Sequence, residues 1–358
     1  KKILIANRGV IAIRALRAAK ELGYEVASVY STVDKDQKHL KLSDEAICIG
    51  PATAKDSYMN DAAIIAAAEL VGADAIYPGF GFLAENASFA EKCKVSGFNF
   101  VGPDSKVIEV MGDKIKAKKL IESLGVPTVP GYAGKIESQN QIENTVEEIG
   151  YPVIVKASAG GGGRGMRVVN KRDELWDSII GAQNEAKVAF GNDEVFIEKY
   201  LKKPRHIEIQ IFGDGKGKVV HLYSRDCSLQ RKYQKIVEEA PAKNVNHEKL
   251  SEIQNICVKA CSELNYKGAG TLEFLYEDND FYFIEMNTRI QVEHTVTEMI
   301  TGVDLVQAQL LLALEDKFEL DQEKLKINGH AMQCRINAED PETFIPSPGR
   351  ITRVHRPG

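Results

Sequence analysis

Fourteen residues near the end of the chain combine side chains that bind anions, bind metals and move protons. The segment from Glu285 to Glu298 reads Glu-Met-Asn-Thr-Arg-Ile-Gln-Val-Glu-His-Thr-Val-Thr-Glu, and it continues directly from the apolar run 281–284. Ionised side chains at the end of a strand must pair with each other, bind a metal or meet a charged ligand, because burial without a partner is costly. The segment therefore predicts a binding site for charged groups.

The residues before this segment predict a β-hairpin, because strand-like runs flank the turn residues 277–280. A two-residue turn would place Leu272 opposite Glu285. A three-residue turn pairs Glu273 with Glu285 instead and brings Asn287 onto the same face. We expect the three-residue turn, because only this register gathers the polar side chains on one side of the hairpin.

The three side chains on that face, Glu273, Glu285 and Asn287, form a candidate metal site. Two carboxylates directly opposite each other repel unless a cation lies between them. Hard oxygen ligands with no Cys among them favour Mg²⁺ or Mn²⁺, carried in with nucleotide phosphates. A solvated hairpin face stays the alternative interpretation.

The first third of the chain alternates strands and helices. We expect strands at 2–6, 25–30, 73–77 and 98–101, and helices at 11–22 and 62–71. This alternation predicts a parallel sheet with helices on both faces. The run Asn7-Arg-Gly9 lacks the spacing of a dinucleotide fingerprint. The glycine-containing run 78–82 is either a ligand-binding loop at the carboxyl edge of the sheet or a simple turn.

The middle third contains a glycine-rich segment between two expected strands, 151–156 and 166–169. The run 160–165 holds five glycines and predicts either a mobile phosphate-binding flap or a flexible hairpin tip. Lys156 favours the flap, since a cation in the strand before the loop can reach phosphates. The GK[ST] signature of a P-loop is missing. The strand expected at 195–201 has an exit that can hold the edge of an adenine.

The stretch 205–240 adds a second group of charged side chains. The alternation of 205–210 predicts a half-buried strand. Arg231 and Lys232 are expected at the surface. Lys235 lies between Gln and Ile, and it is the better candidate for an anion site.

Composition narrows the class of protein. The chain has 358 residues, a net charge of −5 and dispersed Lys and Arg, which argues against nucleic-acid binding. Six Cys without a C-x-x-C pair favour a reduced, cytoplasmic setting, and we expect Cys257 and Cys261 to be buried thiols. No apolar run approaches the length of a membrane span, so no membrane partner is expected.

Taken together, these motifs resemble those of the biotin carboxylase family of ATP-grasp enzymes. The resemblance runs from Lys2 to the end of the chain and rests on Ala6–Gly9, Met111–Lys114, Lys156–Gly165, Glu198–Leu201, Arg205-His206, Gln230–Lys235, Glu273, Glu285–Glu298 and Cys334–Glu339. It implies a mixed α/β and α+β fold in three parts. These are a Rossmann-like pre-ATP-grasp domain at 1–112, an ATP-grasp domain at 113–320 with a mobile glycine-rich lid at about 130–202, and a truncated C-terminal domain at 321–358.

The family uses MgATP (or MnATP) and bicarbonate to carboxylate biotin carried on a partner protein, and the resemblance implies a role for each matching residue. The ATP phosphates and neighbouring groups would be held by Lys114, Lys156, Gly162, Gly163 and His206. The adenine would be lined by Glu198, Lys199 and Leu201, with Gln230 near the ribose and Tyr233 beside the nucleotide. The metal would be bound by Glu273, Glu285 and Asn287. Bicarbonate would be held by Lys235, Arg289, Gln291 and the backbone of Val292. Glu293 would be the general base and Arg335 would stabilise the biotin enolate.

Four positions depart from the family pattern: Val10 replaces Glu, Phe80 a polar aromatic residue, Tyr233 a frequent His, and Thr295 a Pro. The chain stops before the family's C-terminal domain is complete, and it contains no Met-Lys-Met biotin attachment site. A biotin carboxyl carrier protein and a carboxyltransferase are therefore expected as separate partners or domains, with a homodimer as the expected assembly. Two other functions stay open: a carbamoyl-phosphate-like ATP-grasp ligase and a non-catalytic nucleotide-binding module.

Overall fold

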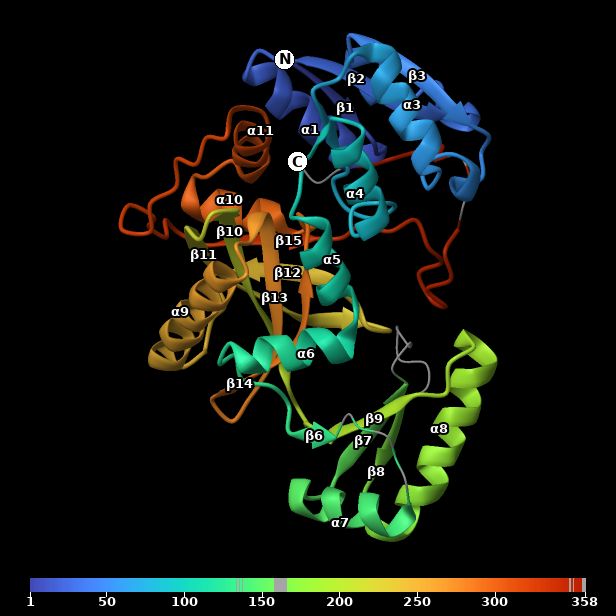
Figure 1. The fold of residues 1–358 in the computed structure, drawn as a ribbon, viewed down its shortest axis with the longest axis vertical. Coiled ribbons are helices and arrows are strands. Elements are labelled where there is room, and N and C mark those ends of the chain that lie inside the picture. The colour runs from blue at the N-terminus through green and yellow to red at the C-terminus, as the bar shows by residue number, and fades with distance from the viewer. Residues whose placement is uncertain are drawn as a thin grey trace.

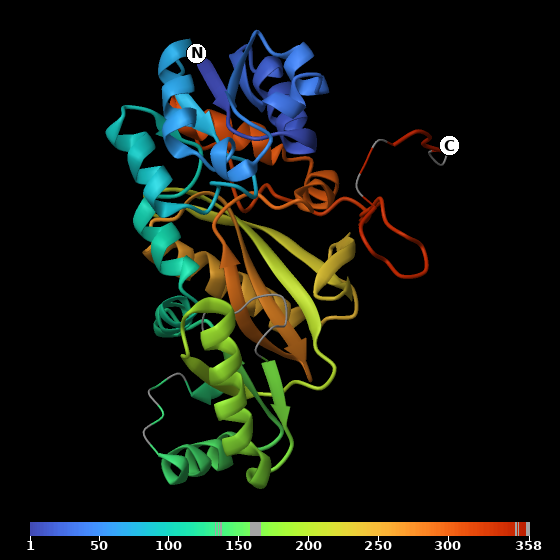
Figure 2. The ribbon, with the colours of Figure 1, turned by 90° about the vertical axis from the view of Figure 1, so that its right-hand side faces the viewer.

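The computed structural model describes residues 1–132, 134, 136, 138–157, 166–347, 349 and 351–355. The predicted flap at 160–165, with Gly162 and Gly163, lies outside these residues. Three units are stacked along the long axis of the molecule, as both ribbon views show (Figure 1, Figure 2). We call them the N-terminal unit, the central unit and the lid. Each is built on its own sheet.

The N-terminal unit is the predicted parallel sheet, with strand order β3-β2-β1-β4-β5. Its elements are β1 (Lys2–Ile5), α1 (Gly9–Glu21), β2 (Glu25–Ser31), α2 (Lys38–Leu42), β3 (Glu45–Gly50), α3 (Asp61–Val71), β4 (Ala75–Tyr77), α4 (Ala87–Val95) and β5 (Asn99–Phe100). Successive residues of β1 point to opposite faces. Ile3 and Ile5 pack with α1 and α11, whereas Leu4 packs with α3 and α4. The alternation prediction is confirmed, although it missed α2, β3 and α4.

The loop 78–82 follows β4 at the carboxyl edge of this sheet. The side-chain amide of Asn7, just after β1, donates hydrogen bonds to the carbonyls of Pro78 at 2.6 Å and Phe80 at 2.8 Å. The two loops that leave neighbouring strands are thus fastened together.

The central unit is an antiparallel sheet with strand order β14-β13-β10-β11-β12-β15. Its strands are β10 (Arg205–Asp214), β11 (Val219–Arg231), β12 (Gln234–Ala240), β13 (Lys267–Glu277), β14 (Asp280–Asn287) and β15 (Ala331–Cys334). Its helices are α5 (Ser105–Gly112), α6 (Lys114–Ser123), α9 (His247–Glu263), α10 (His294–Thr301) and α11 (Leu305–Glu315).

Strand β10 shows why one face of the central sheet carries chemistry. Ile207, Ile209 and Ile211 point into a core shared with α6 and α9, where Cys257 and Cys261 are buried as predicted. The alternate residues, among them Glu208 and Gln210, point to the opposite face and are fully buried there. The predicted alternation of polar and apolar residues is confirmed, but the prediction of a half-buried strand is wrong, because both faces of β10 are buried from Ile207 onward. Because side chains alternate between the two faces of a strand, β10 presents an apolar face to α6 and α9 and a polar face on the other side of the sheet.

The lid is a smaller antiparallel sheet, ordered β6-β9-β7-β8, with its own core. Its elements are β6 (Gly131–Tyr132), α7 (Gln139–Ile149), β7 (Val153–Ala157), β8 (Met166–Val169), α8 (Leu175–Phe190) and β9 (Val195–Lys199). Short 3₁₀ turns occur in the molecule at 32–34, 54–56 and 172–174. In the part of the chain described, no single helix is long and apolar enough to cross a membrane. Among the described helices, only α10 and α11 taken together pass on length and composition, and they are bent by 94°.

Candidate active site

A cavity of about 1000 Å³ is lined by the lid, by α6 and by the polar face of the central sheet. The structure brings all the predicted site residues that it describes to the wall of this cavity. They are Lys114, Lys156, Glu198, Lys199, Leu201, His206, Gln230, Tyr233, Lys235, Glu273, Glu285, Asn287, Arg289, Gln291, Val292, Glu293 and Arg335. These positions span more than 200 residues of sequence, so only the tertiary fold can gather them.

The β13–β14 hairpin has the predicted pairing, but for a different reason. Glu273 lies opposite Glu285, and Asn287 lies on the same face. The predicted three-residue turn is wrong, because the turn contains two residues, Asp278 and Asn279, whose φ angles are 52° and 69°. A bulge between the Glu273 and Phe274 pairs adds one residue to β14 and restores the register. Turn length alone therefore could not decide which side chains share the face.

Lys235 lies at the centre of three carboxylates. Its ammonium is 2.6 Å from Glu208, 2.8 Å from Glu273 and 2.6 Å from Glu293. Burial by itself would lower the pKa of Lys235, but the three negative charges more than offset it and raise the pKa above its usual value. An ammonium has three N–H donors, and here each faces one carboxylate. Lys235 is therefore firmly charged.

Glu293 connects Lys235 to Arg335. One oxygen of its buried carboxylate faces Lys235, and the other is 3.1 Å from the guanidinium of Arg335. Arg335 is held in turn by Glu238, which accepts from its Nε at 2.6 Å, and by its own backbone N–H, which donates to Ile236. Burial raises the pKa of Glu238, although the charge of Arg335 opposes that effect.

Arg289 is held in place by residues of the N-terminal unit and of the central unit. Its guanidinium donates to Asn287 at 2.6 Å and to Glu85 at 2.7 Å. Glu85 follows the 78–82 loop of the N-terminal unit and also accepts from the backbone N–H of Thr288 at 3.1 Å. The position of this anion-binding candidate therefore depends on how the two units dock.

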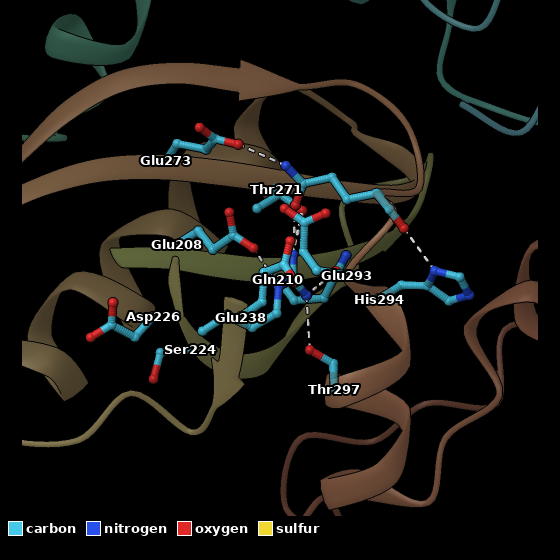
Figure 3. A network of polar contacts seen from close by, with 12 residues as sticks. Glu208, Gln210, Ser224, Asp226, Glu238, Thr271, Glu273, Glu293, His294 and Thr297 are labelled. Carbon is cyan, nitrogen blue, oxygen red and sulfur yellow. Dashed lines mark hydrogen bonds and ion pairs between the residues drawn. The ribbon is translucent and has the colours of Figure 1, made fainter. Parts of the chain in front are cut away.

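Arg225, which sequence reasoning missed, organises the floor of the site. It is fully buried and forms an ion pair with Glu208. It also donates to Gln291 at 2.6 Å and to Thr297 at 2.8 Å. Figure 3 shows the polar contacts of this region, with Glu208, Glu273 and Glu293 labelled and a dashed line to Thr297. Because the guanidinium occupies the carbonyl oxygen of Gln291, the amide nitrogen is left to face Glu273, at 2.7 Å.

Signals for the missed residues were present but weak. Glu208 and Arg225 are charged residues in the middle of β10 and β11, and they lie opposite each other in the β10–β11 pairing. A buried charge on each of two strands suggests an ion pair once the pairing is known. The pairing itself is not readable from the sequence.

The lid side of the cavity contains a second ion-pair cluster. Both carboxylate oxygens of Glu198 accept from ammonium groups, one from Lys118 at 2.8 Å and the other from Lys156 at 2.7 Å. Burial raises the pKa of Glu198, but these two positive charges outweigh it, and the pKa is lowered. Lys199 instead donates to the carbonyls of Gly150 and Tyr151, so its ammonium is hydrogen-bonded within the lid.

The structure also shows the surroundings of four other predicted nucleotide-site residues. His206 is 2.9 Å from Glu273; burial lowers the pKa of His206, but this carboxylate more than offsets it and raises the pKa. Gln230 donates to the carbonyl of Cys227 at 2.9 Å. Tyr233 is 69% exposed, with a φ of 61° in the β11–β12 turn. Leu201 follows β9, where the lid returns to the central sheet.

The expectation for Arg231 and Lys232 is only half right. Lys232 is exposed. Arg231 is partly buried, because it pairs with Glu339 at 2.8 Å and stacks on Phe344 at 4.1 Å. A segment more than 100 residues later in the sequence covers it.

Known proteins have sequences and folds similar to those of this chain. A model of the biotin carboxylase N-terminal domain matches residues 1–108, and one of the carbamoyl-phosphate synthase L chain ATP-binding domain matches residues 113–321. A biotin carboxylase from Haemophilus influenzae is 57% identical over 100% of this chain and 80% of its own length. The chain belongs to the biotin carboxylase family.

Solved biotin carboxylase structures agree with this assignment. A Campylobacter jejuni biotin carboxylase bound to an ATP ligand superposes with a TM-score of 0.93 at 49% identity, covering 100% of this chain and 80% of that one. The biotin carboxylase domain dimer of Hydrogenobacter thermophilus 2-oxoglutarate carboxylase, in complex with MgADP, ADP and bicarbonate, gives a TM-score of 0.91 at 48% identity. It is covered to 79%, and this chain to 100%. A pyruvate carboxylase subunit from Methanothermobacter thermautotrophicus is 49% identical over 100% of this chain and 73% of its own length.

Three of the residues that depart from the biotin carboxylase pattern make no hydrogen bond with the charged side chains around Lys235 that are described above. Val10 is 72% exposed, and Phe80 packs against the core between β1 and α11. The Thr295 hydroxyl donates to Gln333 at 2.6 Å, which ties α10 to β15.

Proposed function

We propose that this chain catalyses the ATP- and bicarbonate-dependent carboxylation of biotin carried on a biotin carboxyl carrier protein or domain, with formation of ADP and phosphate. One observation carries the proposal. The carboxylate of Glu293 lies between Lys235, at 2.6 Å, and Arg335, at 3.1 Å. A base, a cation for the small anion and a cation for the biotin enolate thus meet at one point of the cavity wall.

The proposed metal ligands fit a hard cation. Burial and the negative charge of Glu273 raise the pKa of Glu285, and Lys114, at 3.8 Å, is its cationic neighbour. A divalent cation between the two carboxylates would relieve this repulsion. The carbonyl oxygen of Asn287 accepts one hydrogen bond from Arg289, which leaves its second lone pair for a metal. When bound, Mg²⁺ or Mn²⁺ would neutralise phosphate charge.

The first chemical step uses the anion site. Bicarbonate would be held by Lys235, Arg289, Gln291 and the backbone N–H of Val292. Its O–H proton passes to Glu293, and the oxygen left with the electron pair attacks the γ-phosphorus of ATP, so that ADP leaves and carboxyphosphate forms. A protonated Glu293 no longer competes for Lys235. The N–H group of Lys235 that faced Glu293 can then stabilise the carbonate as its charge increases.

The second step places the carboxyl group on biotin. Carboxyphosphate splits into CO₂ and phosphate, and the phosphate accepts the proton from N1′ of biotin. Charge then develops on the ureido oxygen, where Arg335 would hold it, and N1′ attacks CO₂. Glu238 keeps the Nε side of Arg335 occupied at 2.6 Å, so the remaining guanidinium donors are directed toward Glu293 and the cavity.

Partners follow from the chemistry. Carboxybiotin must deliver its CO₂ at a carboxyltransferase, and we propose that this completes a biotin-dependent carboxylase such as acetyl-CoA carboxylase, in the cytoplasm. A homodimer is the proposed assembly, supported by the dimer named for the Hydrogenobacter protein.

Bicarbonate-dependent ATP hydrolysis, stimulated by free biotin, tests the function. The expected result is ADP release that requires bicarbonate, with ¹⁴C from bicarbonate appearing in carboxybiotin. ATP cleavage that requires ammonia or glutamine and yields carbamoyl phosphate would favour the carbamoyl-phosphate-like ligase. Binding of MgATP without turnover under any of these conditions would favour a nucleotide-binding module.

A further inference from the structure

Lys118 is a cavity-lining cation with no part in the chemistry proposed above. It lies on α6 one helical turn after Lys114, so the two side chains share a face of the helix and their Cα atoms are separated by about 6 Å along its axis. Lys114 points to Glu285 at the metal end of the cavity, whereas Lys118 points to Glu198 at the lid end. Helix α6 therefore supplies a lysine to each end of the proposed nucleotide site.

The ammonium of Lys118 joins three parts of the molecule. It belongs to α6 and donates to the carbonyl of Val129, at 2.6 Å, just before the lid begins at β6. It also pairs with Glu198 on lid strand β9, at 2.8 Å. Its side chain is only 19% exposed. Lys118 thus holds the connection to the lid and the lid's buried carboxylate at the same time.

Glu198 has a second partner, Lys156, and that partner has another task. Lys156 lies on β7 and reaches Glu198 diagonally across the β7–β9 pair, at 2.7 Å. In the proposed function Lys156 contacts ATP phosphates, so at least part of its interaction with Glu198 must be given up when ATP binds. The carboxylate, whose side chain is 9% exposed, would then be left unpaired if no other cation were present.

We propose that Lys118 is a positioning residue for the nucleotide site, which keeps Glu198 ionised and fixed at the base of the lid so that Lys156 can turn to the ATP phosphates. This inference rests on the proposed function. Lys118 contacts no reacting atom. It acts through Glu198, and its contribution is to ATP affinity rather than to the chemical step.

A double-mutant cycle with Glu198 separates this role from simple packing. Lys118→Met keeps the aliphatic stem but removes the charge, and it should weaken MgATP binding about tenfold, the scale of one charge-assisted hydrogen bond. The KM for ATP should rise by a similar factor, with kcat at saturating ATP and the KM for bicarbonate unchanged. In a Glu198→Gln background there is no carboxylate to neutralise, so Lys118→Met should weaken binding by less than about threefold.

Two further variants complete the design. Lys119→Met changes the next, exposed lysine of the same helix and should bind MgATP like the parent protein. Lys118→Arg keeps the charge and should stay within about threefold of the parent. Lys118→Arg buries no uncharged side chain beside Glu198. Its MgATP affinity therefore still tests the proposal if Lys118→Met does not fold.

Equal losses from Lys118→Met in the two backgrounds, or a loss for Lys118→Arg as large as that for Lys118→Met, would overturn the role of Lys118. An equal loss from Lys119→Met would do the same. These results leave the proposed function standing if the parent protein binds MgATP and turns over. A parent protein that does not bind MgATP would instead refute the proposed function.

Discussion

Replacing Lys235 by Met removes the positive charge from the centre of the site while keeping most of the side-chain volume. Three buried carboxylates then lose a shared partner at 2.6–2.8 Å. The loss is incomplete, because each carboxylate keeps a second partner. Arg225 stays with Glu208, His206 with Glu273 and Arg335 with Glu293.

The size of the effect follows from these remaining pairs. Removing one member of a buried ion pair costs about 3–5 kcal/mol, and the remaining partners place Lys235→Met at the lower end, about 3 kcal/mol. Unfolding entropy of about 2.1 cal/mol/K per residue over 358 residues converts this to a fall in Tm of about 4 °C. Carboxylation of biotin should be lost, while MgATP affinity should change little, since the nucleotide has its own cations.

The loss of stability should depend on pH. The pKa values of Glu208 and Glu273 are lowered in the folded protein: burial opposes this, but Arg225 for Glu208, His206 for Glu273 and Lys235 for both more than offset it. Their contribution is therefore present above the unfolded pKa of about 4.3 and is lost as pH falls through the folded values. Without Lys235 these pKa values rise, so the variant's carboxylates take up protons at higher pH. The deficit should be largest near pH 8 and smaller at pH 5.

Thermal unfolding of both proteins at pH 8 and pH 5, with MgATP binding measured in parallel, checks this reasoning. Lys232→Met, on the exposed turn three residues away, is the matched control and should unfold like the parent. Equal midpoints for Lys235→Met and parent at pH 8 would refute the view that Lys235 neutralises the carboxylates. Loss of MgATP binding as severe as that from Lys156→Ala would refute its assignment to the small anion.

Three other substitutions test the remaining roles. Glu293→Gln cannot accept a proton and should lower kcat by roughly 10²–10⁴-fold with little change in the KM for ATP; a smaller loss would argue against a general base. Arg335→Gln should retain slow bicarbonate-dependent ATP cleavage but uncouple it from ¹⁴C fixation on biotin, and proportional loss of both activities would contradict the division between base and enolate stabiliser. Glu273→Gln should raise the Mg²⁺ concentration needed for half-maximal activity, and an unchanged Mg²⁺ titration would favour a merely solvated glutamate.

The sequence was sufficient wherever the controlling interactions are local. Strand and helix alternation over the first hundred residues predicted a parallel sheet, because periods of 2 and 3.6 record which face of each element is buried. The alternation at 205–210 likewise predicted that one side of β10 would be apolar and the other polar. Clustered charges after 281–284 marked the site, and their order supported the family resemblance.

The β13–β14 hairpin lies at the limit of such reasoning. Its pairing was predicted correctly from the need to gather Glu273, Glu285 and Asn287, yet the predicted turn was wrong. A two-residue turn and a bulge give the same register as a three-residue turn. Local sequence does not distinguish these solutions, since both satisfy the same strand period.

Only the tertiary structure decided which charges neutralise one another. Lys235 meets carboxylates 27, 38 and 58 residues away, and Arg289 meets Glu85 at a separation of 204 residues. Strand alternation shows that a charged side chain faces inward, but the identity of its partner depends on sheet order and on how separate units dock. Electrostatic energy depends on distance in space, whereas the sequence records distance along the chain. For that reason Arg225, Glu238 and Lys118 became visible only when the fold placed them beside Gln291, Arg335 and Glu198.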